Sequence, residues 1–210
     1  MKLTSQSFRD GGAIPGRCAF AVIDPKAHVR LSANRNPELS WSGAPAGTQG
    51  FALLCVDPDA PSVGTDVNQE GRSVKKTLAR AEFMHWALVD LPPSLARIDE
   101  GACSEGVTPH GKTAPKGPAG SRQGVNDYTG WFANDKDMAG TYLGYDGPCP
   151  PWNDELPHHY RFEVHALDLA RCPLGDPFTV ADVRKAIAGH ALARAHITGL
   201  YSLNPAVQLP

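Results

Sequence analysis

The stretch FALLCVDPD, at residues 51–59, limits the folds that this chain can adopt. In an extended strand Phe51 and Leu53 point to one side, while Ala52 and Leu54 point to the other. Both faces of such a strand are apolar, so neither face suits contact with water. The stretch therefore predicts a central strand, covered on both sides, within a sheet.

The rest of the chain predicts a mainly β fold. Further strands are predicted at the following ranges: 17–23, 28–32, 82–92, 158–169 and 193–203. Thr179 with Asp182 resembles a capping box that opens a helix over 180–189, whereas residues 36–50 look like a loop anchored by Trp41. Strands and helices do not alternate, so we expect an antiparallel β-sandwich with a few peripheral short helices, one near the C-terminus.

Composition limits the function classes. The 210 residues suit one domain, and a net charge of −2 without long runs of one sign argues against nucleic-acid binding. No apolar stretch is long enough to span a membrane, and the N-terminus lacks the apolar segment of a signal peptide. Five scattered cysteines without a CxxC motif indicate free thiols and a cytoplasmic location.

Three motifs place polar side chains at strand ends. In DPDAP, Asp57 and Asp59 are two residues apart and would face the same way in extended geometry. His85 alternates with apolar residues in FMHWAL. In HHYRFEV, His158 and Tyr160 share the inward, apolar face, and the histidine between them points outward. If the ends of these strands meet, they form a pocket with two carboxylates, two imidazoles and a phenol.

Each motif also has an ordinary structural interpretation. DPDAP has the composition of a turn, since Asp and Pro are both common turn residues. A core histidine at position 85 could bond a backbone carbonyl, and the HHY residues could form a packed, hydrogen-bonded rim. None of the motifs identifies a site by itself.

Four motifs taken in order are more specific. DPDAP, HWALVDLP, GYDGPCPP and HHYRFEVHALD together resemble the phosphatidylethanolamine-binding protein family, in its bacterial, Raf-kinase-inhibitor-like branch. The resemblance extends from about residue 17 to residue 203. It implies a Greek-key β-sandwich with a small pocket for phosphate or the phosphoryl head group of a lipid, without a cofactor, metal ion or catalytic residue. The residues that it places at the pocket and its rim are Asp57, Asp59, His85, Gly147, Cys149, His158, Tyr160, Pro61 and Phe83.

The resemblance suggests how an anion could be bound beside carboxylates. We expect Asp57 and Asp59 to orient an imidazole, and a protonated His85 or His158 to face the phosphate. Binding should then strengthen as the pH falls from about 8 to 6. The turn around Cys149 would add backbone N–H donors.

The resemblance also bears on partners. A regulator of phosphorylation-dependent signalling and a homodimer are both expected from it. No protein partner is identified by the sequence. The C-terminal helix that brings a tyrosine near the pocket in animal members is not evident here, so kinase inhibition is not carried over.

Two alternatives use the same residues. The Asp/His set could assist metal-dependent or acid–base hydrolysis, with Cys149 as a nucleophile beside His158. A protein-interaction module could instead read phosphopeptides or keep the pocket as a vestige. The long segments 62–82 and 101–130 are predicted loops, and Lys112 lies in a part of the second that could be solvated or could act as a lid that attracts anions.

Overall fold

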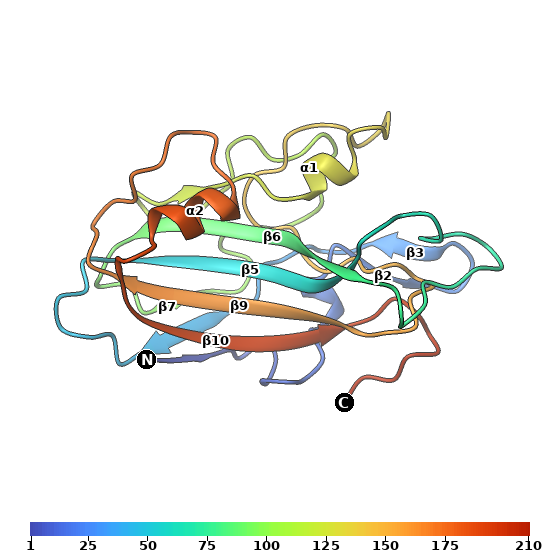
Figure 1. Ribbon diagram of the computed structural model, residues 1–210, viewed down its shortest axis with the longest axis horizontal. Coiled ribbons are helices and arrows are strands. Elements are labelled where there is room, and N and C mark those ends of the chain that lie inside the picture. The colour runs from blue at the N-terminus through green and yellow to red at the C-terminus, as the bar shows by residue number, and fades with distance from the viewer.

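The computed structural model describes all 210 residues, and its largest element is a five-stranded antiparallel sheet (Figure 1). In spatial order its strands are β10 (Ala191–Tyr201), β9 (His158–Leu167), β5 (Gly50–Pro61), β6 (Arg80–Leu91) and β8 (Arg122–Gln123). The middle strand is β5, which contains the FALLCVDPD stretch and is buried along most of its length. The predictions of a mainly β, antiparallel fold and of a central strand here are confirmed. The Greek-key connection stays a prediction.

A smaller sheet covers one face of this sheet. It consists of β1 (Lys2–Thr4), β4 (Leu39–Ser42) and β7 (Arg97–Ile98). The main core lies between the two sheets, where the rings of Trp41 and Phe51 meet edge to face at 5.5 Å. A separate hairpin pairs β2 (Ala21–Asp24) with β3 (His28–Leu31), next to a 3₁₀ turn, η1 (Gly16–Cys18).

The prediction that residues 36–50 form a loop is wrong, because they contain β4. Leu39 and Trp41 point into the core, and Ser40 between them does not. Four residues between two turn-rich stretches are too few for alternation to be recognised in the sequence. The anchoring role expected of Trp41 is confirmed, since only 5% of it is exposed.

The other face of the large sheet carries the predicted helix. In α2 (Val180–Ala186) the capping box is present, with the Thr179 side chain accepting from the Asp182 N–H and the Asp182 carboxylate accepting from the Thr179 N–H. Val183 packs in a second apolar cluster with Leu54 of β5. The helix ends three residues before the predicted position 189. No helix in the structure is both long and apolar enough to cross a membrane.

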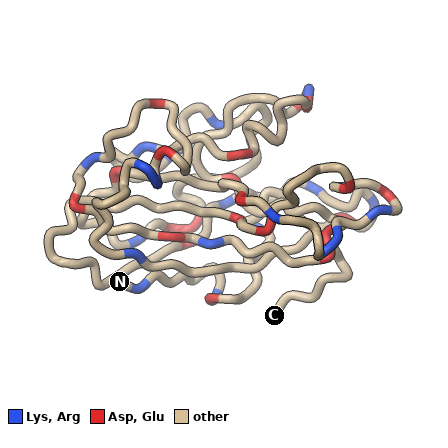
Figure 2. Tube along the Cα trace, viewed as in Figure 1, with Lys and Arg blue, Asp and Glu red and all other residues tan.

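The two long connections differ in how they are held. Asn153 fastens the segment that follows β5, since its side-chain amide donates to the carbonyls of Asp66 and Arg72 and its carbonyl accepts from the N–H of Asn68. The prediction that 101–130 is a loop throughout is wrong, because this range contains β8 and most of α1 (Tyr128–Trp131), a one-turn helix that the sequence did not reveal. Figure 2 shows acidic and basic residues interspersed along the whole trace, without a stripe of one sign.

Candidate functional site

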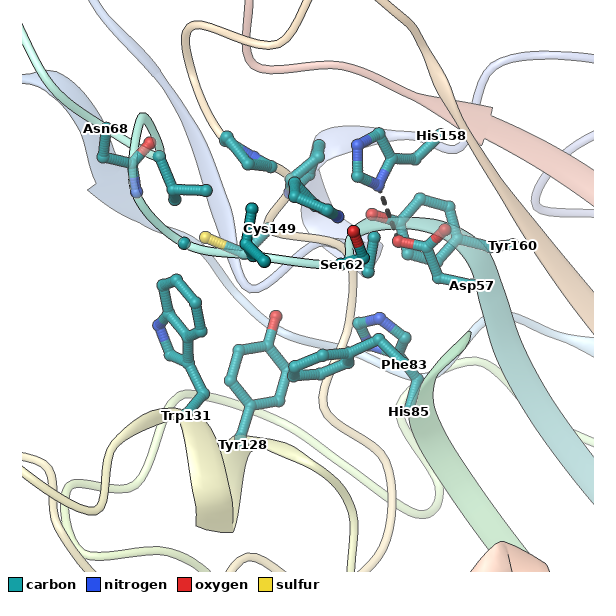
Figure 3. Close-up of a pocket in the computed structure, with 17 residues that line it drawn as sticks. Asp57, Ser62, Asn68, Phe83, His85, Tyr128, Trp131, Cys149, His158 and Tyr160 are labelled. Carbon is teal, nitrogen blue, oxygen red and sulfur yellow. Dashed lines mark hydrogen bonds and ion pairs between the residues drawn. The ribbon is translucent and has the colours of Figure 1, made fainter. Parts of the chain in front are cut away.

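An open cavity of about 160 Å³ lies at one end of the large sheet. Its walls come from β5, β6 and β9, from the segment after β5, from the turn at residues 149–151 and from α1. Figure 3 shows Asp57 and His158 at one end of this cavity and Trp131 at the other, with Tyr128 beside Trp131. The cavity therefore has a polar end and an aromatic end.

Most of the predicted site residues meet in this cavity. Those that line its wall are Asp57, Pro61, Phe83, His85, Cys149, His158 and Tyr160. Two predicted residues, Asp59 and Gly147, do not line it. The ends of three strands therefore do meet at this cavity. The positions of Asp59 and Gly147 outside its wall each have a structural explanation.

Asp59 faces away from the cavity because β5 is irregular at this point. The pairing of β5 with β6 shifts register between Asp57 and Ala60, and the Asp57 carboxylate accepts the N–H of Asp59 at 2.8 Å. The Asp59 carboxylate instead accepts from the backbone N–H and the ring Nδ1 of His159, each at 2.8 Å. The expectation that both aspartates face the same way is wrong for this reason.

Gly147 lies beneath the cavity and has a packing role. A Cβ at this position would lie 2.2 Å from the carbonyl oxygen of Cys18, so no larger residue fits. Its N–H donates to the Asn34 side chain at 2.8 Å and is not available to a ligand. The N–H of Cys149, two residues later, has no acceptor within the chain. The sequence led us to expect free backbone N–H donors in this turn, and only Cys149 has one.

Four buried or partly buried charged side chains form one network below the polar end. His158 lies between two carboxylates, with Nδ1 at 2.7 Å from Asp57 and Nε2 at 3.2 Å from Asp154. Arg80 pairs with both oxygens of Asp154, at 2.6 and 3.1 Å. We call these four residues the charge cluster.

The charge cluster holds His158 in its protonated form. Burial alone would lower the pKa of His158, but hydrogen bonds to Asp154 and Asp57 outweigh burial and raise this pKa to about 9. Burial likewise opposes ionisation of Asp154, yet hydrogen bonds from His158 and Arg80 hold its pKa below the usual value. Two carboxylates are then balanced by one imidazolium and one guanidinium. The polar end of the cavity rests on a cluster without net charge.

His85 differs from His158. Its Nδ1 donates to the carbonyl of Asp146 at 2.7 Å, so the neutral ring leaves a lone pair on Nε2. Burial lowers the pKa of His85, and the nearby Asp57 carboxylate offsets this only in part. The Asp146 carboxylate is in turn held by Lys112 at 2.6 Å and by the side-chain amides of Asn34 and Asn126. His85 is therefore neutral near pH 7 and has a fixed tautomer.

Tyr160 has the least ordinary environment in the cavity wall. It is 1% exposed, and its hydroxyl makes no hydrogen bond with any group of the chain. Burial raises the pKa of this phenol well above its usual value, so it remains a hydrogen-bond donor. Nothing in the sequence could show that this hydroxyl lacks a partner.

Lys112, in the segment before β8, and Arg122, in β8, are not free to act as a lid. Lys112 is 13% exposed and ion-paired to Asp146, and Arg122 is bonded to Asp90 and to the carbonyls of Cys172 and Leu174. Both side chains hold the segment to the body of the protein. A lid that attracts anions through these two residues is excluded by their contacts.

The sequence missed several residues of the site. Asp154 and Arg80 complete the charge cluster but lie outside the motifs that pointed to it. Tyr128 and Trp131 line the aromatic end from a helix too short to give a periodic pattern. The acidic residues of DELP, directly before HHY, were a sequence feature that could have pointed to Asp154. No sequence feature pointed to Arg80.

Comparison with known proteins identifies the family. The family model described as phosphatidylethanolamine-binding protein matches residues 4–202. A UPF0098 protein of Methanothermobacter thermautotrophicus is 32% identical over 201 residues, which cover 96% of this chain and 98% of that protein. The UPF0098 protein YbhB of Escherichia coli is 30% identical, with 96% and 100% covered.

A solved structure agrees with these matches. The crystal structure of E. coli YbcL, described as a member of the mammalian PEBP family, superposes with a TM-score of 0.68 at 28% identity, covering 96% of this chain and 97% of the other. The chain belongs to the phosphatidylethanolamine-binding protein family.

Proposed function

We propose that this protein binds the phosphoryl group of a small ligand, free phosphate or a phosphorylated head group, at the polar end of the cavity. The observation that carries the proposal is the buried, unpartnered hydroxyl of Tyr160. Buried polar groups in proteins are nearly always paired, and leaving one unpaired costs about 1–3 kcal/mol. A ligand oxygen that accepts from this hydroxyl removes that cost.

Two further groups match a phosphate that carries one proton. Cys149 lines the same cavity, and its N–H, which has no acceptor within the chain, would be a second donor. The lone pair on His85 Nε2 is an acceptor, which suits the P–OH of a phosphate monoanion. We call these two groups, together with the Tyr160 hydroxyl, the phosphoryl site.

The charge cluster offsets the repulsion that the Asp57 carboxylate would otherwise exert on an anion at the polar end of the cavity. Two like charges about 4 Å apart repel by roughly 4 kcal/mol at an effective dielectric constant of 20. The Asp57 carboxylate would oppose an anion to that extent if it were unpaired, but His158 lies 2.7 Å from it. Both nitrogens of His158 are already bonded to carboxylates, so this residue supports the site electrostatically and does not donate to the ligand.

The hydrolase alternative has less support. The structure contains no group of three or more His, Cys, Asp or Glu side chains placed to hold a metal ion. Burial raises the pKa of Cys149 to about 12, which leaves a thiol and not a nucleophilic thiolate at neutral pH. We therefore propose a binding protein and not an enzyme. A role in phosphorylation-dependent signalling would act through the same phosphoryl site.

The substitution Tyr160→Phe tests the proposal, because it removes only the unpartnered hydroxyl. In the wild type, phosphate or O-phosphoethanolamine at 100 times its Kd should add about 2.7 kcal/mol of stability. For a chain of this size that is a rise in Tm of about 5–10 °C. In the variant the affinity should fall about 10- to 150-fold, the loss expected for a hydrogen bond to a charged group, while the Tm without ligand stays the same or rises.

Tyr201→Phe is the matched control. The Tyr201 hydroxyl is also buried but donates to the carbonyl of Ala21 at 2.8 Å. Its removal should lower stability by about 1 kcal/mol and leave phosphate affinity unchanged. Equal phosphate affinity in wild type and Tyr160→Phe, or no effect of either ligand on a folded wild type, would overturn the proposal.

A further inference from the structure

The cavity is open, and its exposed lining residues include the polar Ser62 and Asn68 as well as large apolar side chains. Five large hydrophobic side chains in the chain are exposed, and two of them, Val63 and Trp131, line this cavity. Val63 is 53% exposed and Trp131 is 52% exposed. Single exposed apolar residues need no explanation, but two at the wall of one cavity indicate a surface that becomes covered.

Trp131 differs from the other aromatic residues of the wall because its ring has no aromatic partner. Tyr128, one turn earlier in α1, stacks on Phe20 at 4.5 Å and donates its hydroxyl to the Gly147 carbonyl. Tyr160 packs edge to face against the ring of His85 at 5.0 Å. Trp131 appears in no such pair, and its side chain makes no hydrogen bond; only its backbone N–H does, donating to the Asp127 carbonyl at 2.9 Å. Its indole face is therefore available inside a cavity whose other rings are all engaged.

The position of Trp131 relative to the phosphoryl site determines what would cover it. Figure 3 shows Trp131 at the far end of the cavity from Asp57 and His158, with the Tyr128 ring beside it. A ligand whose phosphoryl group is held at the phosphoryl site has to direct its ester substituent along the cavity, toward Trp131. The flat indole of Trp131 is the exposed aromatic surface that the substituent reaches there.

We propose that the ligand is a phosphate monoester of a planar aromatic group, and that Trp131 determines this specificity by stacking on that group. This inference rests on the proposed function, because the phosphoryl site sets the ligand's orientation. Aromatic stacking adds attraction beyond the burial of area, and a flat ring covers the flat indole face more completely than a flexible alkyl chain does. Together the two effects should give about a tenfold gain in affinity over inorganic phosphate.

Titration calorimetry at pH 7 with three probes tests the inference. The probes are inorganic phosphate, n-butyl phosphate and phenyl phosphate. Wild type should bind phenyl phosphate about tenfold tighter than inorganic phosphate, with butyl phosphate between them. Trp131→Ala should bind phenyl phosphate no tighter than inorganic phosphate and should keep the wild-type affinity for inorganic phosphate. Trp131→Leu retains an apolar contact without a flat ring, so it should bind butyl and phenyl phosphate equally.

Leu31→Ala is the control, since Leu31 is 56% exposed and does not line the cavity. It should behave as wild type with all three probes. Inorganic phosphate binding with no gain for phenyl phosphate would overturn this inference and leave the proposed function standing. Equal affinity of wild type for butyl and phenyl phosphate would also overturn it. Absence of binding by every probe would overturn both.

An aryl phosphate could be a free molecule or the side chain of a phosphorylated tyrosine. N-acetyl-O-phosphotyrosine amide separates these sources, because it carries the backbone atoms of a peptide on the same ring. Binding as tight as that of phenyl phosphate supports an aryl phosphate on a protein. Exclusion of the peptide derivative, with phenyl phosphate bound, supports a free aryl phosphate.

Discussion

Raising the pH from about 6.5 to 8.5 should destabilise this protein through one residue, His158. Its pKa is about 9 in the folded protein, against 6.5 for an ordinary histidine. A group whose pKa is raised by folding stabilises the native state fully below its unfolded pKa, and the effect is lost as the pH rises through the folded pKa. At about 1.36 kcal/mol per pKa unit, the full contribution is roughly 3 kcal/mol, of which about 2 kcal/mol is lost by pH 8.5.

Thermal unfolding across this pH window measures the effect. The Tm of the wild type should fall by about 4–8 °C between pH 6.5 and 8.5, at about 2–4 °C per kcal/mol. Folding also raises the pKa values of buried thiols such as Cys18 and Cys103, which adds a smaller loss toward high pH. That background is common to wild type and variants, so the difference between their pH profiles isolates His158.

His158→Gln supplies the comparison, since its amide does not titrate. The variant should be less stable at pH 6.5 and should lose the extra fall in Tm toward pH 8.5. If it does not fold, Asp154→Asn serves instead, because it removes one of the two carboxylates that raise the pKa of His158 and should move the fall in Tm to lower pH. A wild-type profile as flat as that of His158→Gln, or one that falls over the same pH range as that of Asp154→Asn, would refute the assignment of a protonated His158 in the charge cluster.

Two other outcomes follow from the site. Gly147→Ala should lower the free energy of unfolding by about 3 kcal/mol or more, or abolish folding, because the new Cβ would lie 2.2 Å from the Cys18 carbonyl oxygen. Gly130→Ala is the control, since nothing lies within 4 Å of its new Cβ, and its urea midpoint should be nearly unchanged. Equal urea midpoints for the two variants would contradict the packing argument. A phosphate monoester should bind more tightly at pH 7 than the matching sulfate ester. The reason is that only the phosphate, with a second pKa of about 6, can offer a P–OH to His85 Nε2. Equal affinities for the two esters would show that this hydrogen bond does not form.

The pH dependence of ligand binding also changes from the sequence-based expectation. The sequence suggested a protonated histidine that faces the anion and titrates near pH 6.5. In the structure His158 stays protonated through this range and is enclosed by carboxylates, whereas His85 is neutral. In the complex we propose, the relevant proton near neutral pH would be the one shared between the ligand and His85, and its apparent pKa would belong to that pair.

The parts of the site that the sequence predicted depend on local pattern. A strand that is apolar on both faces identified the centre of the sheet, and alternation in HHYRFEV correctly placed His158 and Tyr160 inward and His159 outward. The order of four motifs then identified the family. These features are local, so one sequence is sufficient to recognise them.

The parts that the sequence did not predict depend on contacts between distant segments. The register shift that turns Asp59 away arises from the pairing of β5 with β6. Arg80 reaches Asp154 across 74 positions of the chain, and Trp131 lies on a single turn of helix without a periodic pattern. The missing partner of the Tyr160 hydroxyl is a property of packing alone.

A crystal structure of the protein grown with inorganic phosphate at about 100 times its measured Kd would test the central claim most directly. The account predicts one phosphate in the cavity, with oxygens about 2.5–3.0 Å from the Tyr160 hydroxyl and from the Cys149 nitrogen. The same structure should retain His158 between Asp57 and Asp154. A phosphate bonded to the ring of His158, or an empty cavity at that concentration, would contradict the account.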